Sequence, residues 1–192
     1  MKKSVLSLVL AVFTGFTSIA NTTVDDEKKQ VKTSESTVTW KGYKVTGSHH
    51  GNIDLKEGSL IFDGDNLIGG EFIVDMGSLV SNDLEGKSKG KLENHLKSDD
   101  FFGVAAHPTS KLVFTKVKAS GKNSYEVKGD LTIKGKTKSI SFDISVYGSK
   151  ATATMKVDRS LYDVKYGSGS FFDNLGDKTI YDEFDLVVDL VF

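Results

Sequence analysis

Apolar and polar residues alternate most regularly between residues 125 and 147. Apolar side chains take every second position on both sides of a Gly135–Lys136 turn, and charged or hydroxyl-bearing residues lie between them. The apolar positions are Tyr125, Val127, Leu131, Ile133, Ile140, Phe142, Ile144 and Val146. Because successive side chains of a strand point to opposite faces, this pattern predicts a β-hairpin with one apolar and one polar face.

The same period of two recurs along most of the chain, which predicts an all-β protein. The other predicted strands contain Val38 and Trp40, Ile53 and Leu55, Leu60 and Phe62, Phe72 to Met76, Leu112 and Phe114, Ala151 to Val157, and Phe184 to Phe192. About eight antiparallel strands favour a closed barrel or a sandwich. A barrel of about eight strands is either filled by its own side chains or holds one small ligand.

One region, residues 83–108, departs from this alternation. It is rich in charged residues, and Leu92, His95 and Leu96 have the i, i+3, i+4 spacing of a helix face. We therefore expect a short helix there, ending near Ser98 and inserted between two strands.

The N-terminal residues 1–20 have the pattern of a secretory signal peptide. Lys2 and Lys3 precede an apolar run, and small residues near Ala20 suit cleavage. A membrane anchor is disfavoured because the run is shorter than the about 20 residues needed to span a bilayer. Residues 21–35 are polar and predict a flexible linker, which leaves residues 36–192 as one domain. We expect the protein to be periplasmic or secreted.

The cysteine content and the charge of the chain limit how it can be stabilised and which partners it can have. The chain has no cysteine, so an exported domain must be stabilised by its core without disulfides. The formal net charge is −1, and lysines are interspersed with acids along the sequence. This pattern argues against nucleic acid or an anionic membrane surface as the main partner.

Three segments carry a resemblance to a known family. They are residues 95–103 followed by His107-Pro108-Thr109, residues 129–138, and Val157-Asp158-Arg159 together with residues 182–192. In this order they resemble the YceI-like family of exported lipid-binding proteins. The family usually has a tyrosine before the proline, whereas this chain has His107.

The resemblance implies a fold and a ligand. The fold is an eight-stranded antiparallel lipocalin-like barrel with one short helix inserted between strands and an elongated apolar tunnel. The ligand is an isoprenoid quinone or another long-chain polyisoprenoid or amphiphilic lipid, carried, stored or sensed in the periplasm without covalent chemistry. No other cofactor, no nucleic acid and no stable membrane insertion are expected, and the oligomeric state, a homodimer included, is left open.

The candidate lipid-binding residues are the apolar side chains on the inward face of the strands. They are Trp40, Phe62, Phe72, Val74, Met76, Phe114, Leu131, Ile133, Phe142, Ile144, Met155, Phe184 and Leu186. The adjacent pairs Phe101–Phe102 and Phe171–Phe172 lie in loop-like segments and are candidates for a mouth or lid, with one ring of each pair facing away if the chain is extended. Alternation marks burial and not an empty lumen, so for any single strand position a packed core is the simpler interpretation.

Arg159, the only arginine, is a candidate contact for a carboxylate or phosphate head group. The alternative is a structural ion pair with a nearby aspartate. His49–His50 is a weak metal candidate, because neighbouring strand residues point to opposite faces. Adjacent acids at 99–100 and 182–183 do not by themselves mark a hydrolase, so no catalytic or metal site is predicted.

Two other functions are consistent with parts of this pattern. A small outer-membrane β-barrel would also alternate, with its apolar face toward lipid. The charged region 83–108 argues against it, as do predicted strands shorter than the about 9–11 residues of a spanning strand. An extracytoplasmic hydrolase is the weaker alternative.

Overall fold

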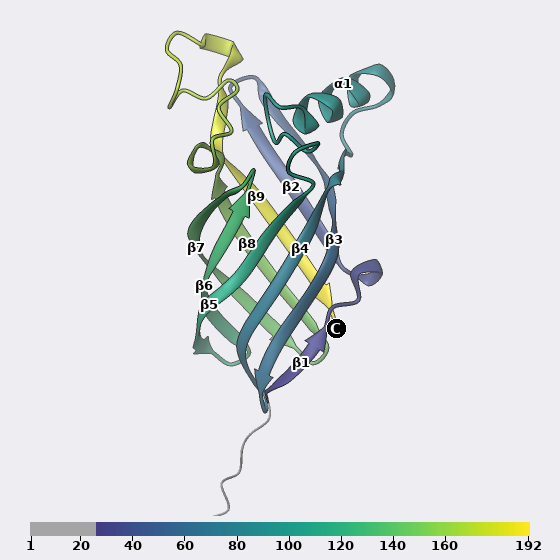
Figure 1. The fold of residues 1–192 in the computed structure, drawn as a ribbon, viewed down its shortest axis with the longest axis vertical. Helices are drawn as coiled ribbons and strands as arrows, with labels where there is room; N and C mark the ends of the chain where they lie inside the picture. Colours follow the sequence, from purple (N-terminus) through teal and green to yellow (C-terminus); the bar gives the residue numbers. More distant parts are fainter. Residues whose placement is uncertain (1–25) are drawn as a thin grey trace, which may run out of the picture.

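The computed structural model describes residues 26–192, so the predicted signal peptide and residues 21–25 lie outside the described part. Nine strands form one antiparallel sheet that closes into a barrel (Figure 1). The strands are β1 (Glu27–Gln30), β2 (Thr37–Lys44), β3 (Gly47–Asp63), β4 (Asn66–Ser81), β5 (Thr109–Gly121), β6 (Ser124–Ile133), β7 (Lys136–Tyr147), β8 (Lys150–Asp158) and β9 (Ile180–Val191). The helices are α1 (Gly86–Lys97) and the short 3-10 turns η1 (Thr33–Glu35), η2 (Arg159–Tyr162) and η3 (Gly176–Lys178).

Eight of these strands, β2 to β9, make the closed ring. They follow the order β3-β2-β9-β8-β7-β6-β5-β4, and β4 pairs with β3 to close it. The predicted hairpin is β6 and β7, in register from Ser124 opposite Ser145 to Ile133 opposite Lys136. The predicted eight-stranded antiparallel barrel with one inserted helix is confirmed.

The strands are longer than the sequence pattern predicted. The runs around Ile53 and Leu60 belong to a single strand, β3, of 17 residues. The register of β3 against β4 shifts between Leu55 and Glu57, and both Lys56 and Glu57 are exposed. Such a bulge interrupts the alternation without ending the strand. Strand length therefore does not exclude an outer-membrane barrel.

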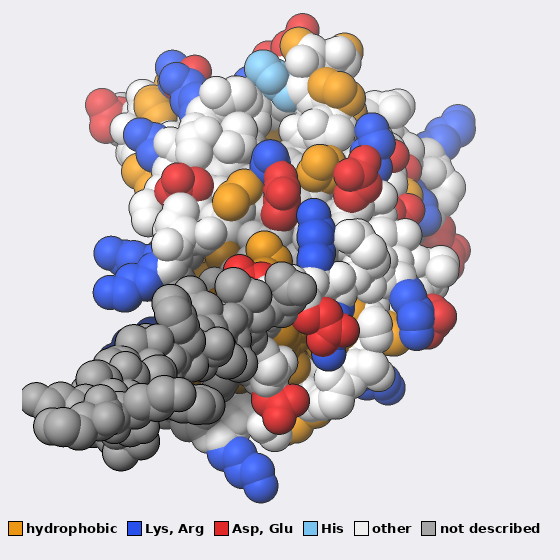
Figure 2. Space-filling model, turned by 60° about the horizontal axis from the view of Figure 1, so that its bottom comes forward, with side chains coloured by type: hydrophobic (Ala, Val, Ile, Leu, Met, Phe, Trp, Pro, Cys, Tyr) orange, Lys and Arg blue, Asp and Glu red, His pale blue; other side chains and the backbone are white. Residues whose placement is uncertain are grey.

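The direction of the side chains argues more strongly than strand length against an outer-membrane barrel. Along β8, Ala151, Ala153, Met155 and Val157 are buried, and the residues between them are exposed lysines and threonines. Figure 2 shows acidic and basic side chains interspersed over the outer face that it presents. An outer-membrane barrel needs an apolar outer face, and this barrel has its apolar face inside.

Among residues 26–192, no helix has the length and apolar character required to cross a membrane.

The linker prediction is wrong for residues 27–35. Residues 27–30 are strand β1, which pairs with β3 beyond the end of β2, with Lys29 opposite Leu60. The N–H of Val31 donates to Gly58 O at 2.8 Å, and Val31 is buried. β1 is held mainly by backbone hydrogen bonds to the part of β3 that extends beyond β2, and its side chains are largely exposed. A strand held in this way can be polar, so the polar composition did not reveal it.

The two ends of the barrel are closed differently (Figure 1). At one end, the ring of Phe62 lies 5.7 Å from that of Phe192, and the Tyr125 hydroxyl donates to Asp65 O. At the other end lie α1 and the long segment before β9. The predicted helix is confirmed at Gly86–Lys97, and it stops where the Ser98 hydroxyl donates to His95 O at 2.7 Å.

We expect Phe142→Asp to lower the free energy of unfolding by about 3–5 kcal/mol, because it places an unpaired charge in the apolar interior. Phe142 is 9% exposed. Ser141→Asp is the control, since Ser141 is exposed on the opposite face and lies across from Lys128. Urea denaturation measures both, and equal stabilities would contradict the assigned facing.

Candidate functional site

The interior of the barrel contains two adjoining apolar cavities. The upper cavity, toward α1, has a volume of about 130 Å³, and the lower cavity has a volume of about 70 Å³. Val38, Val74, Leu131 and Leu186 line both, so the two spaces meet at one level of the barrel. The lumen is therefore neither a solid core nor a wide channel.

The predicted strand positions, with one exception, line these cavities. Trp40, Val74, Met76, Leu131, Ile133, Phe184 and Leu186 line the upper cavity, and Phe72, Val74, Phe114, Leu131, Phe142, Ile144, Met155 and Leu186 line the lower one. Phe62 is the exception: it is buried, but it belongs to the closed end described above. The prediction left out further lining residues that the same alternation marks: Val38, Ile53, Leu55, Val188 and Leu190.

Glycines shape the wall of both cavities. A Cβ built on Gly70 would lie 2.9 Å from the ring of Phe114, and one on Gly58 would lie 2.8 Å from the ring of Phe72. These rings therefore rest directly over the strand backbone instead of filling the centre. Gly42 lines the upper cavity on the same face of β2 as Trp40, and a Cβ there meets nothing within 4 Å. A wall position without a side chain thus widens the upper cavity.

Phe101 and Phe102 cover the upper cavity together. Their rings are 5.0 Å apart and close to perpendicular. The chain is not extended here, because the N–H of Phe101 donates to Ser98 O and the N–H of Phe102 donates to Leu96 O. The expectation that one ring faces away therefore does not apply. The Lys134 ammonium holds this turn by donating to Asp99 O at 2.9 Å and to Phe101 O at 2.8 Å.

Phe171 and Phe172 do not line the lumen. They are 41% and 50% exposed in the segment between η2 and η3. The structure thus separates two pairs that the sequence grouped together: the first lies over the cavity and the second lies at the surface.

Arg159 lines the upper cavity, but its donors serve the backbone. It is 3% exposed, and it donates to Tyr181 O at 3.2 Å, Val164 O at 2.6 Å and Ile180 O at 2.9 Å. Its Nη2 lies 3.4 Å from Asp182 Oδ1. Burial lowers the pKa of Arg159, which Asp182 and Asp158 oppose, and a guanidinium remains charged in proteins. The arrangement favours the structural role that the sequence left open.

An aromatic stack links α1 to the segment after β8. The His95 ring lies edge-on to Tyr166 at 4.3 Å and to Phe101 at 5.8 Å, and the Arg159 guanidinium lies 5.3 Å from the Phe101 ring. His95 Nε2 is buried and, among the described residues, has no hydrogen-bond partner. The stack positions Phe101 over the upper cavity.

Comparison with known proteins decides the family. Residues 29–192 match the YceI-like domain. The chain belongs to the YceI-like family. A UPF0312 protein of Pseudomonas savastanoi pv. phaseolicola is 31% identical over 144 residues, covering 73% of this chain and 70% of the relative. A UPF0312 protein of Pseudomonas putida is 29% identical over 154 residues, covering 77% and 74%.

Solved structures show the same fold as this YceI-like chain. BcnA of Burkholderia cenocepacia superposes with a TM-score of 0.64 at 22% identity, covering 84% of this chain and 99% of that one. A polyisoprenoid binding domain from Saccharophagus degradans has a TM-score of 0.59 at 13% identity, covering 84% and 95%. A YCEI protein of Campylobacter jejuni has a TM-score of 0.52 at 18% identity, covering 98% and 96%.

Hydrogen bonds from His49, His50 and Ser81 to Asp83, which together we call the Asp83 clip, fix the junction of β4 and α1 in this YceI-like barrel. The Nδ1 of His49 lies 2.7 Å from Asp83 Oδ2, and Asp83 Oδ1 accepts from the Ser81 hydroxyl and the His50 N–H. Partial burial tends to raise the pKa of Asp83, but the bonds from His49, Ser81 and His50 outweigh it and lower the pKa to about 2. The ring of His49 and the backbone N–H of His50 thus both bind Asp83. In residues 26–192 no three His, Asp or Glu side chains gather to hold a metal ion.

Neither acidic pair forms a site with the cavities. Asp182 accepts from the Ser170 hydroxyl at 2.6 Å and faces Arg159, whereas Glu183 points to Lys156 at 3.5 Å. Asp99 and Asp100 are exposed in the turn after α1. Neither pair lines a cavity.

We expect Arg159→Lys to lower the free energy of unfolding by about 3 kcal/mol, because a single ammonium cannot replace the guanidinium hydrogen bonds to the carbonyls of Val164, Ile180 and Tyr181. Lys156→Arg is the control, since Lys156 is exposed on the outer face, and it should change stability by less than about 0.5 kcal/mol. Unchanged stability with weakened lipid uptake would instead assign Arg159 to the head group.

The lowered pKa of Asp83 makes stability depend on acid pH. The folded pKa of about 2 lies below the ordinary value of 3.8, so the contribution is complete above about pH 4 and is lost as pH falls toward 2. We expect the stability advantage of the wild type over Asp83→Asn to shrink over this range in urea titrations at several pH values. The exposed Asp143→Asn serves as the charge control, and a constant advantage down to pH 2 would contradict the clip.

Proposed function

We propose that this protein binds a long-chain isoprenoid or similar amphiphilic lipid in its lumen and serves as an extracytoplasmic carrier, store or sensor without covalent chemistry. The observation that carries the proposal is the pair of adjoining apolar cavities inside a closed barrel. The Saccharophagus degradans domain with this fold is described as polyisoprenoid binding, which supports the same class of ligand here.

The lining suits a hydrocarbon tail. Every residue around the lower cavity is apolar. The upper cavity adds the polar side chains of Tyr43, Tyr181, Ser110 and Arg159, so an amphiphile would place its head at this end. The Ser110 hydroxyl is directed to the sulfur of Met76 at 3.0 Å. Among the described residues that line the cavities there is no histidine or acid to act as a general base, which supports binding over hydrolysis.

The energetics require a preformed lumen. Burying about 400 Å² of a lipid tail contributes roughly 10 kcal/mol at about 25 cal/mol per Å². Association and ordering cost about 4–15 kcal/mol, so little remains if the barrel must also be ordered on binding. The closed strand ladder meets this requirement. Met76 and Met155 line the two cavities and have flexible side chains that can turn to admit a longer tail.

Native mass spectrometry of the protein as cells process it, followed by organic extraction, tests the proposal. We expect a co-purified lipid, or uptake of an isoprenoid quinone added from ethanol. Repeated recovery of empty protein that also takes up no added quinone or polyprenol would refute lipid binding.

Gly42→Leu should block the lumen without harming the fold. The new side chain would extend into the open space of the upper cavity. We expect at least about tenfold weaker quinone uptake with unchanged or higher stability, because glycine weakens a strand interior. Gly90→Leu on α1, where a Cβ also meets nothing within 4 Å, is the matched control and should bind as the wild type does. Equal uptake by both variants would contradict a ligand in the upper cavity.

A further inference from the structure

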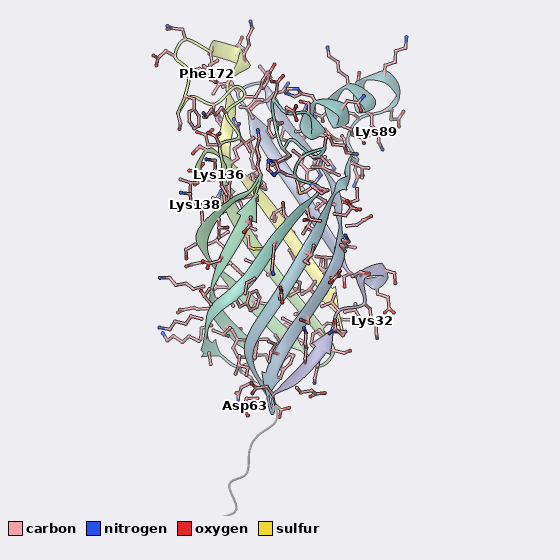
Figure 3. All side chains as sticks on the ribbon, viewed as in Figure 1. Lys32, Asp63, Lys89, Lys136, Lys138 and Phe172 are labelled. Carbon is pink, nitrogen blue, oxygen red and sulfur yellow. The ribbon has the colours of Figure 1, made fainter. Side chains whose placement is uncertain are left out.

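The segment from η2 to Asp173 exposes a group of large apolar side chains at the upper end of the barrel. Leu161 is 49% exposed, Tyr166 48%, Phe171 41% and Phe172 50%. Figure 3 shows Phe172 at the end of the molecule opposite Asp63. None of these four side chains lines the upper cavity, although Tyr166 supports its cover through His95.

The backbone that presents the two phenylalanines is firmly held. The N–H groups of Phe171 and Phe172 both donate to Ser168 O, and Ser168 is fully buried. The Ser170 hydroxyl donates to Asp182 on β9 at 2.6 Å. The two rings are therefore exposed because a hydrogen-bonded turn holds their backbone in place.

Lysines of this segment and of the start of β7 lie near these rings. The Lys165 ammonium of the segment lies 5.2 Å from the Phe171 ring and 2.8 Å from Asp163. The hydrogen bond from Lys165 lowers the pKa of Asp163, and the charges of Lys136 and Lys134 add to this effect. Figure 3 shows Lys136 and Lys138 on the flank below Phe172.

The sheet topology explains why these parts meet. β7 pairs with β8 only from Asp143 to Tyr147, so the first half of β7 has no β8 neighbour. η2 packs against β7 instead. Lys136 and Lys138 on β7 thus come beside the exposed segment that begins at η2. We call Leu161, Tyr166, Phe171 and Phe172, with Lys134, Lys136, Lys138 and Lys165, the lysine–aromatic corner.

We propose that the lysine–aromatic corner, a local group of lysines in a chain whose charges are otherwise mixed, docks the barrel on an anionic membrane surface, where lipid enters or leaves the lumen. This proposal rests on the proposed function, since a lipid ligand resides in a bilayer before it is bound. Aromatic rings at the level of the head groups and lysines facing anionic lipid are the features of interfacial binding. Lys165 is paired with Asp163, and the Lys134 ammonium donates to two backbone carbonyls. Lys136 and Lys138 are exposed and form no ion pair among the described residues, so they can face anionic lipid.

The corner is also joined to the cavity. Arg159, Ile180 and Tyr181 line the upper cavity. Two of them hold the exposed segment: Arg159 donates to Val164 O, and the Ile180 N–H donates to Gly167 O at 2.8 Å. A second copy of the chain is a poorer occupant, because a symmetric contact would bring the lysines of both copies together.

Vesicle sedimentation of the processed protein tests the docking. Wild type should bind vesicles containing phosphatidylglycerol more strongly than pure phosphatidylcholine vesicles, and high salt should weaken the binding. Lys136→Gln with Lys138→Gln should weaken it about 30-fold, from about 1 kcal/mol per lysine. Phe171→Ser with Phe172→Ser should weaken it by at least about tenfold.

Matched controls are available on the barrel itself. Lys116→Gln with Lys118→Gln removes the same charge from exposed positions on β5. Tyr147→Ser removes an aromatic residue that is 57% exposed at the opposite end, beside the C-terminus. Both should bind vesicles as the wild type does. Equal loss in these controls, or no vesicle binding by the wild type, would overturn the proposal.

Quinone uptake from ethanol separates this inference from lipid binding itself. The corner variants should take up added quinone normally and acquire it from vesicles at least about tenfold more slowly. Vesicle binding without any quinone uptake would support docking and reject the proposed function. A dimer in light scattering that the phenylalanine variant abolishes, with no vesicle binding, would assign the corner to a second copy and overturn docking.

Discussion

The pairing of β2 with β9 is the constraint on which the rest of the structure depends. It joins the first and last strands of the ring along the chain, so every barrel strand has neighbours on both sides and the apolar faces must point to one interior. The number of strands sets the diameter of a closed barrel, whatever side chains it contains. Glycines at 58 and 70 let phenylalanine rings lie against the wall, and two cavities remain between them.

A ring of strands cannot close its own ends, and the two ends differ in what closes them. The lower end is closed by Phe62 on β3 and Phe192 directly after β9, whose rings pack together. The upper end is closed by α1 and the turn of Phe101 and Phe102, which lie outside the ladder. These are held by side chains: the Lys134 ammonium, the His95 stack and the Asp83 clip. A few such contacts are easier to open than a strand ladder, so the proposed ligand would enter at the upper end.

Arg159 shows how one residue can serve the structure and border the site. Its guanidinium joins η2 to the start of β9 and rests against Phe101, so the cover of the cavity and the exposed segment share one support. The unpaired upper parts of β7 and β8 make room for this support. The same arrangement brings Lys136 and Lys138, far from Phe172 in sequence, to the same corner.

The sequence by itself determined the facing of the strands, the hairpin of β6 and β7, the inserted helix and the family, because period-two alternation and local spacing are properties of neighbouring residues. It also marked most of the lumen, since an inward apolar residue must line whatever the barrel encloses. The tertiary structure alone decided that β1 pairs with β3, that the run at Ile53 continues to Leu60, and that the interior is partly hollow. It also decided that Phe101–Phe102 covers the cavity while Phe171–Phe172 faces outward, and that Arg159 binds carbonyls. These outcomes depend on contacts between residues far apart in the chain, on which alternation carries no information.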